Sequence, residues 1–379
     1  MDRAMAPDRS DATLAHSDAE VRTRGPDPLA RRKKVARLAW AVLGYNVAVV
    51  LWGAFVRASG SGAGCGRHWP LCNGEVVPQP KSIATVIEAT HRATSGIALV
   101  AVVLLLVATL VGFQRGHRAR RGAAFATAFI FGEALIGAGL VLFELVASDA
   151  SMKRAFSMIL HLGNTFLLLG ALALTAWWAE TEPLDVAKKR GPLAEGEAQG
   201  GATSEAAAPA DGARRPTFLR AAIGLCLASV LVLGASGAVA ALGDTLFPAT
   251  SLREGLRQDL SPMAHAFLRL RMLHPLIALA AGVLVLGTAG LVRSMSTSAR
   301  ARSFARLVTI LFVVQFGAGL LNLSLLAPVG MQLVHLLLAD ATWIALVLMA
   351  WEAWGARDRA ADASAALPAL GAGRPKLGL

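Results

Sequence analysis

The chain has 379 residues, of which 55% are hydrophobic and only 16% charged, and this composition excludes an ordinary soluble domain of that length. A formal net charge of +12 would suit a nucleic-acid-binding protein, but the basic residues lie in clusters between apolar segments rather than on one folded face. We therefore expect an integral membrane protein that contacts membrane lipid and has no nucleic-acid partner.

Eight apolar segments are long enough to cross a membrane, since a helix needs roughly 20 apolar residues to span the hydrocarbon core. They cover residues 38–56, 93–114, 122–143, 155–179, 221–243, 272–292, 307–327 and 331–351. The sequence therefore predicts an all-α integral membrane fold with eight transmembrane helices.

Basic clusters fall before the first segment and in every second connection after it. Because such loops stay in the cytoplasm, both ends of the chain are predicted to be cytoplasmic (N-in and C-in). Residues 1–30 contain several acids and lack the apolar core of a secretory signal, and a mitochondrial presequence would be poor in acids. We expect a multi-pass protein of a bacterial inner membrane.

Three stretches have the composition of disordered chain. Residues 1–30 and 355–379 are predicted to be cytoplasmic tails, and the Ala/Gly/Glu-rich residues 181–216 a cytoplasmic linker. The linker divides the segments four and four, which gives a first half at 31–180 and a second half at 217–354.

The two halves resemble each other. "IGAGLVL" at 136–142 is similar to "FGAGLLN" at 316–322. One histidine lies near the predicted outer end of each even-numbered segment: His91, His161, His274 and His335. A parallel repeat of two similar four-helix bundles, with two of these histidines in each half, would explain both similarities.

The loop after the first segment reads "GCGRHWPLCNG" and contains Cys65 and Cys72. The charge pattern places this loop outside, where a disulfide can persist, so a disulfide is predicted and two free thiols are the alternative. Cys226 lies within the fifth segment and is interpreted as a packing residue.

The second segment begins with "IEATHRATSG", which holds Glu88, His91 and Arg92. Thr85 and Glu88 have the spacing of a capping box, and Glu88 and Arg92 that of a helical ion pair. Glu88 also lies one turn before His91 on the same helical face, which suits a carboxylate that moves protons. Both interpretations stay open on these residues.

Four histidines at matched depths favour a shared chemical purpose, because ionisable residues in a membrane are costly. Pairs of imidazoles on facing helices are a common way to hold haem iron, whereas zinc favours a tight cluster of Cys, His and carboxylates. We expect His91 to pair with His161, and His274 with His335. Four arginines are candidates for contacts to haem propionates, with interfacial snorkelling as the alternative: Arg57, Arg92, Arg269 and Arg271.

Two further features concern the second half and the membrane interior. "SLREGLRQDL" at 251–260 predicts a short surface helix with Ser251 and Glu254 as its capping box, and the sixth segment is expected to begin near Pro275. The buried acids Glu133 and Asp340 suit either a proton path or pairing between helices.

The first half resembles the haem A synthase family. "VRASGSG", the cysteines of "CGRHWPLC", "NG" and "EATHR" carry this resemblance, and the other histidines fall where that family places its own. Many members have a second cysteine pair in the loop between the fifth and sixth segments, which is absent from this loop, and Pro275 stands where a basic residue often follows the histidine.

The resemblance implies oxidation of a methyl group of haem O to a formyl group, which yields haem A for terminal oxidases. It implies that His91 and His161 hold the substrate haem, that His274 and His335 hold a haem b cofactor, and that Glu88 is catalytic. Haem O synthase and cytochrome oxidase assembly factors are the protein partners that it suggests, and a homo-oligomer is left open.

Two other functions fit parts of the sequence. A non-catalytic dihaem b-type electron-transfer cytochrome would need the four histidines but neither Glu88 nor the cysteine pair. A transporter would explain a parallel repeat, but the segments lack the paired Gly/Pro breaks of substrate-binding discontinuous helices.

Overall fold

The computed structural model describes residues 28–79, 82–182 and 210–366, and within these ranges it contains nine helices and no strand. The helices are α2 (Pro28–Ala58), α3 (Ile83–Gly112), α4 (Arg118–Leu142), α5 (Met152–Thr181), α6 (Ala210–Leu246), α7 (Leu252–Leu260), α8 (Ala266–Met295), α9 (Ala299–Ser324) and α10 (Val329–Ala366). All except α7 are long and apolar enough to cross a membrane, which confirms the eight predicted spans.

Polar residues begin most of these helices. Ser82, Ser151, Ser251 and Ser298 each accept a hydrogen bond from a backbone N–H of the first turn. Two histidines, His117 and His265, cap α4 and α8 in the same way. These side chains satisfy backbone donors that a helix leaves without a partner at its start.

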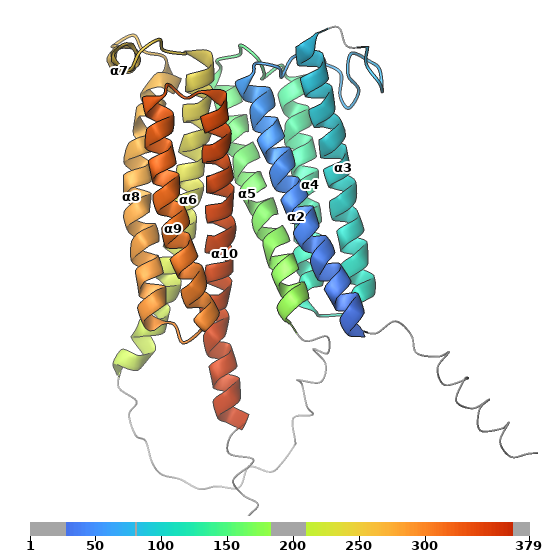
Figure 1. Cartoon of the computed structure of the whole chain (residues 1–379), viewed down its shortest axis with the longest axis vertical. Coiled ribbons are helices and arrows are strands. Elements are labelled where there is room, and N and C mark those ends of the chain that lie inside the picture. The colour runs from blue at the N-terminus through green and yellow to red at the C-terminus, as the bar shows by residue number, and fades with distance from the viewer. Residues whose placement is uncertain (1–27, 80–81, 183–209, 367–379) are drawn as a thin grey trace, which may run out of the picture.

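Figure 1 shows the long helices running side by side, with the beginnings of α2 and α6 at the same end as the ends of α5 and α10. We call α2–α5 the first half and α6–α10 the second half. Within the first half, α2 packs against α3 and α5, and α4 packs against α5. Within the second half, α6 packs against α8, and α9 against α10.

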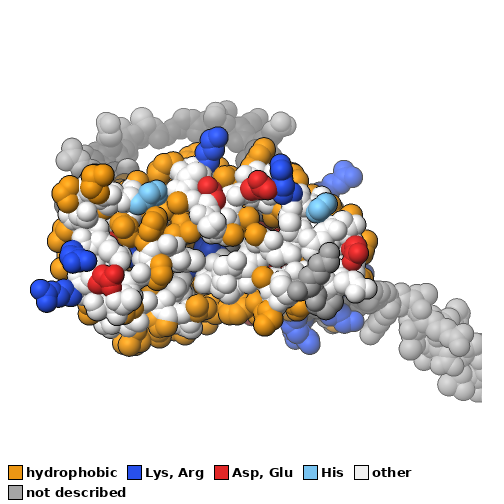
Figure 2. Space-filling view, turned by 90° about the horizontal axis from the view of Figure 1, so that it is seen from above, with side chains coloured by type: hydrophobic (Ala, Val, Ile, Leu, Met, Phe, Trp, Pro, Cys, Tyr) orange, Lys and Arg blue, Asp and Glu red, His pale blue; other side chains and the backbone are white. Residues whose placement is uncertain are grey.

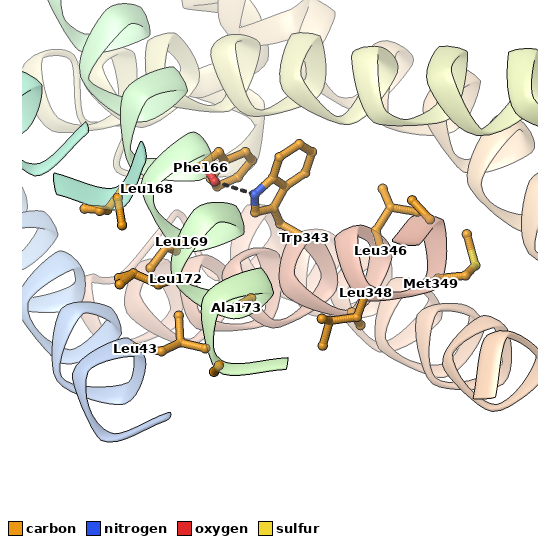
Figure 3. Packing of buried hydrophobic residues seen from close by; sticks show 14 of the residues in the cluster. Leu43, Phe166, Leu168, Leu169, Leu172, Ala173, Trp343, Leu346, Leu348 and Met349 are labelled. Carbon is orange, nitrogen blue, oxygen red and sulfur yellow. Dashed lines mark hydrogen bonds between the residues drawn. The ribbon is translucent and has the colours of Figure 1, made fainter. Parts of the chain in front are cut away.

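The halves meet mainly through α5, which packs against α6 and α10. Figure 3 shows this junction: the Trp343 ring of α10 stacks on Phe166 of α5 with ring centroids 5.2 Å apart. The indole N–H of Trp343 donates to the backbone oxygen of Phe166 at 2.6 Å. Leu168, Leu169 and Leu172 of α5 are fully or almost fully buried in the same cluster.

The short helix α7 lies at the end of the molecule opposite the N-terminus of α2 (Figure 1). Ser251 accepts from the N–H of Glu254 at 3.2 Å, so the predicted surface helix and its cap are confirmed. Figure 2 views this end from above and shows hydrophobic side chains around the rim with charges of both signs between them. An apolar rim suits helices surrounded by lipid.

One sequence-based expectation for the sixth span is wrong. Helix α8 begins at Ala266, so Pro275 lies in its interior rather than in its first turn. A proline there removes one backbone hydrogen bond, a loss that neighbouring helices and polar side chains offset in membrane proteins. The expected tails and linker lie largely outside the described residues, although α6 begins at Ala210 and α10 continues to Ala366.

Candidate functional site

The loop that follows α2 is folded over the start of α3. Cys65 and Cys72 form a disulfide, as predicted. Gly64 lies against the backbone of Ala84 and Thr85 so closely that a Cβ atom would clash there, and its carbonyl accepts from the Thr85 hydroxyl at 2.8 Å. This loop therefore covers the end of α3 that carries the first histidine.

Glu88 connects the disulfide loop to α3 through hydrogen bonds. Its Oε2 accepts from the backbone N–H of Cys65 at 2.8 Å, and its Oε1 accepts from Arg92 at 2.5 Å. The side chain is almost fully buried. The cap of α3 is Ser82, so the capping-box interpretation of Glu88 is wrong and the interpretation as an ion pair with Arg92 is confirmed.

His91 lies one turn further along α3 and faces Gly53 of α2. A Cβ atom at Gly53 would lie 2.8 Å from the imidazole Cε1, so a side chain there would displace this ring. The Nδ1 atom of His91 is buried and without a hydrogen-bond partner. The pairing of this ring with His161 of α5 stays a prediction.

The second-half histidines have similar surroundings. His274 of α8 faces Gly237 of α6, where an added Cβ would lie 3.1 Å from Cε1, and its Nδ1 lies 2.9 Å from the Ser236 hydroxyl. His335 of α10 faces Gly319 of α9, where the corresponding distance is 2.8 Å. His335 Nδ1 is buried without a partner.

His274 and His335 are spaced as two ligands of one metal would be. Their ring centroids lie 6.4 Å apart. Two imidazoles that bind a metal from opposite sides have centroids roughly 6–6.5 Å apart, because each metal–nitrogen bond is about 2 Å. Among the described residues, no three or more His, Cys, Asp or Glu side chains are grouped so that they could hold a metal ion. Paired imidazoles between apolar helices fit haem iron.

The four arginines suggested for propionates all have protein partners. Arg57 donates to Ala241 O, Thr245 Oγ1 and Gln332 Oε1 of the second half at 2.5–2.7 Å. Arg92 donates to Glu88 and to the backbone oxygens of His68 and Leu71. Arg269 donates to Pro262 O, and Arg271 pairs with Asp244 and Asp259. A haem propionate would therefore have to bind N–H groups of these arginines that do not already donate to the protein.

Sequence reasoning missed the glycines that face the histidines. Gly53, Gly237 and Gly319 lie on neighbouring helices and have no fixed sequence distance from the rings they accommodate. Gly53 and Gly237 occupy corresponding places, each on the first helix of its half and opposite the histidine of the second long helix.

Asp340 is fully buried in α10, and neither of its carboxylate oxygens has a hydrogen-bond partner.

Fold and site together define a multi-pass bacterial membrane protein with a pair of histidines in each half. The profile of the cytochrome oxidase assembly protein family (COX15-CtaA) matches residues 36–347, a range that includes all four histidines. The chain belongs to this family, the haem A synthase family.

Two groups of curated relatives are similar to different extents. "Protoheme IX farnesyltransferase" proteins of two Thermus thermophilus strains are 46% identical over 320 residues, which is 84% of this chain and 48% of theirs. This chain thus spans about half the length of those relatives. "Heme A synthase" proteins of Bacillus mycoides and Bacillus cereus are 38% identical over 111 residues, which is 29% of this chain and 36% of theirs.

Proposed function

We propose that the protein is a haem A synthase that oxidises a methyl group of haem O to the formyl group of haem A. The buried carboxylate of Glu88, one turn from His91 and beneath the disulfide loop, is the observation that carries this proposal. A protein that only transfers electrons needs the histidine pairs, but it has no need of an acid at this place.

We assign His91 and His161 to haem O as the substrate, and His274 and His335 to a resident haem b. The glycines that face His91, His274 and His335 and the 6.4 Å spacing of the second pair support this assignment. The bound haem b supplies one-electron redox chemistry. The residues of this chain hold the two macrocycles between apolar helices and keep bulk water from the first-half site.

Glu88 acts as the proton acceptor in this scheme. Converting a methyl to a formyl group with water as the oxygen source releases four electrons, which pass to an external electron acceptor, and four protons, which must leave the site. Hydrogen bonds from Cys65 N–H and from Arg92 fix the orientation of the Glu88 carboxylate. The disulfide loop holds the carboxylate at the end of α3.

The relatives support a place in haem A biosynthesis. The name of the Thermus relatives records farnesylation of protohaem, and about half of their length is similar to this chain. A chain that combines haem farnesylation with a segment like this one would bring consecutive steps together. Haem O synthase and cytochrome oxidase assembly factors are therefore the protein partners that we propose.

Glu88→Gln tests the proposal, because the amide keeps the shape of the side chain but cannot take up the proton. In cells that also make haem O, we expect the variant to retain bound haem while formyl production falls at least 100-fold, the lower range of general acid–base contributions. Haem extraction and chromatography would measure haem O, the hydroxylated intermediate and haem A.

Glu144→Gln is the matched control, since Glu144 is an exposed acid that pairs with Arg67 at the same end of the molecule. It should leave haem A at the wild-type level. Wild-type haem A from Glu88→Gln would remove the catalytic role and leave Glu88 as a fastener of the loop. Absence of haem A from the wild-type chain, with both haems bound, would favour the dihaem electron-transfer cytochrome.

A further inference from the structure

Glu133 of α4 is held by three side chains of α5. Its Oε2 lies 2.8 Å from Nδ1 of His161. Its Oε1 accepts from Asn164 Nδ2 at 2.6 Å and from Thr165 Oγ1 at 3.1 Å. A carboxylate that accepts from two other donors has little freedom to rotate away from the imidazole.

The backbone of α4 next to Glu133 leaves room for the Asn164 side chain. Gly132 faces Asn164, and a Cβ atom there would lie 2.7 Å from Asn164 Oδ1. The same amide also donates to Phe129 O at 2.8 Å, so it bridges the backbone of α4 and the Glu133 carboxylate. Pairing of two helices alone would not require the acid to meet a proposed iron ligand at its Nδ1.

We propose that Glu133 is a positioning residue for the first-half haem: it accepts a hydrogen bond from Nδ1–H of His161 and so directs Nε2 of that ring to the iron. It also places a negative charge beside His161, whereas His335, the corresponding histidine of the second half, has no such charge beside it among the described residues. The inference rests on the proposed function, because it takes His91 and His161 as the ligands of the haem that the first half holds. In this arrangement Nδ1 of His161 donates to Glu133 and Nε2 binds the iron.

The second half offers its histidines only neutral partners. The Ser236 hydroxyl lies 2.9 Å from His274 Nδ1, and the Gln315 carboxamide lies 3.3 Å from His335 Nε2. At Nδ1, the chain thus places a carboxylate beside His161 in the first half and a hydroxyl beside His274 in the second. The two haems would otherwise have similar ligands.

A carboxylate behind a ligating imidazole makes the imidazole a stronger donor to the metal. The stronger donor and the nearby negative charge both favour the oxidised iron, so they lower the reduction potential of the haem. We therefore expect Glu133 to make the first-half haem the more reducing of the two. This difference would distinguish the haem that is modified from the haem that stays resident.

Redox titration of the purified full-length protein loaded with haem, monitored by optical and electron paramagnetic resonance spectra, tests the inference without measuring catalysis. His161→Ala and His335→Ala first assign each low-spin signal to a half. Glu133→Gln should keep the first-half low-spin signal and move its midpoint potential to a more positive value. Glu133→Ala, which no longer orients the ring, should reduce or abolish that signal.

Ser236→Asp is the reciprocal variant, because the Ser236 hydroxyl lies 2.9 Å from Nδ1 of His274, as Glu133 lies beside Nδ1 of His161. It should move the second-half midpoint to a more negative value and leave the first half unchanged, whether or not the Glu133 variants accumulate. Glu144→Gln, on the exposed surface, should change neither midpoint.

Wild-type midpoints and wild-type low-spin signals in both Glu133 variants would overturn the inference. If those variants are unchanged while the wild-type chain produces haem A, the positioning role alone fails. If the midpoints shift as expected while the wild-type chain produces no haem A, the proposed function fails and the positioning role stands. A wild-type chain with no haem signal that depends on His161 would overturn both.

Discussion

His117 begins α4 as its N-cap. The imidazole Nδ1 accepts from the N–H of Ala119 at 3.2 Å, and the ring stacks on Phe113 with centroids 4.2 Å apart. The side chain is fully buried, and this burial lowers the pKa of His117 from its ordinary value of 6.5. The neutral ring is therefore both the form that caps the helix and the form that burial favours.

This arrangement makes the start of α4 sensitive to acid. Because the folded pKa is below 6.5, the stabilisation by neutral His117 is complete above pH 6.5 and is lost as the pH falls from there through the folded pKa. We expect the thermal unfolding midpoint of the wild-type chain to fall over this window more steeply than that of His117→Asn, which keeps a capping group but does not titrate. His117→Ala should lose about 1 kcal/mol at neutral pH.

Parallel pH profiles for the wild-type chain and His117→Asn would contradict this assignment. The sequence gives little sign of such a role, because a lone histidine before a basic cluster is equally compatible with an exposed loop.

The contacts of Glu88 could likewise be predicted only in part from the sequence. Its ion pair with Arg92 follows from their spacing in a helix, whereas its bond to Cys65 N–H depends on how the disulfide loop folds back onto α3.

At the scale of helices, contacts between glycine and histidine position three of the candidate ligands. The rings of His91, His274 and His335 each lie over a backbone without a Cβ atom, which lets the imidazole come close to the neighbouring helix. Small residues at helix interfaces have this effect generally in membranes. The glycines therefore fix where the imidazoles stand between the helices.

Gly53→Ala should displace His91, since the new Cβ would lie 2.8 Å from the ring. We expect the low-spin haem signal that depends on His161 to weaken or shift in this variant. Gly44→Ala on the same helix is the control, because an added Cβ there meets nothing within 4 Å. That variant should keep the signal, and equal spectra for both variants would show that Gly53 does not set the ring position.

The spans themselves could be predicted from the sequence, because hydropathy over about 20 residues reflects a strong constraint of the bilayer. The ends of the helices could not. Helix α8 continues through Pro275 back to Ala266, since its cap at His265 and its packing on α6 outweigh the loss of one backbone bond. The candidate histidines could be chosen from their repetition in the sequence, but the glycines opposite His91, His274 and His335 depend on packing between helices that a single sequence does not specify.

At the scale of the whole molecule, the junction of the two halves uses buried polar contacts as well as apolar packing. Trp343 of α10 donates to Phe166 O, and Trp177 of α5 donates to Glu352 of α10 at 2.9 Å. Arg57 of α2 reaches Gln332 of α10. Groups that would otherwise be unpaired in hydrocarbon thus satisfy one another across the junction.

Trp343→Phe should weaken this junction. Phenylalanine retains an aromatic ring beside Phe166 but loses the hydrogen bond to the Phe166 backbone oxygen, which lies inside α5, at a cost of about 0.5–1.5 kcal/mol. We expect a lower thermal unfolding midpoint in detergent or in a lipid bilayer. Trp354→Phe is the control, because the Trp354 indole nitrogen has no hydrogen-bond partner. A midpoint for Trp343→Phe as high as that of the control would contradict the importance of this bond.

These contacts also have a consequence for the order of synthesis. Trp343, Glu352 and Gln332 all belong to α10, the last of the described helices to leave the ribosome. The first half must therefore remain in the bilayer with the Trp177 indole and part of the Arg57 guanidinium without their final partners until α10 has been inserted. A nascent chain that stalls before α10 would expose these donors to lipid or to membrane quality-control proteases, so arrival of the last helix completes the assembly of the first half as well as the second.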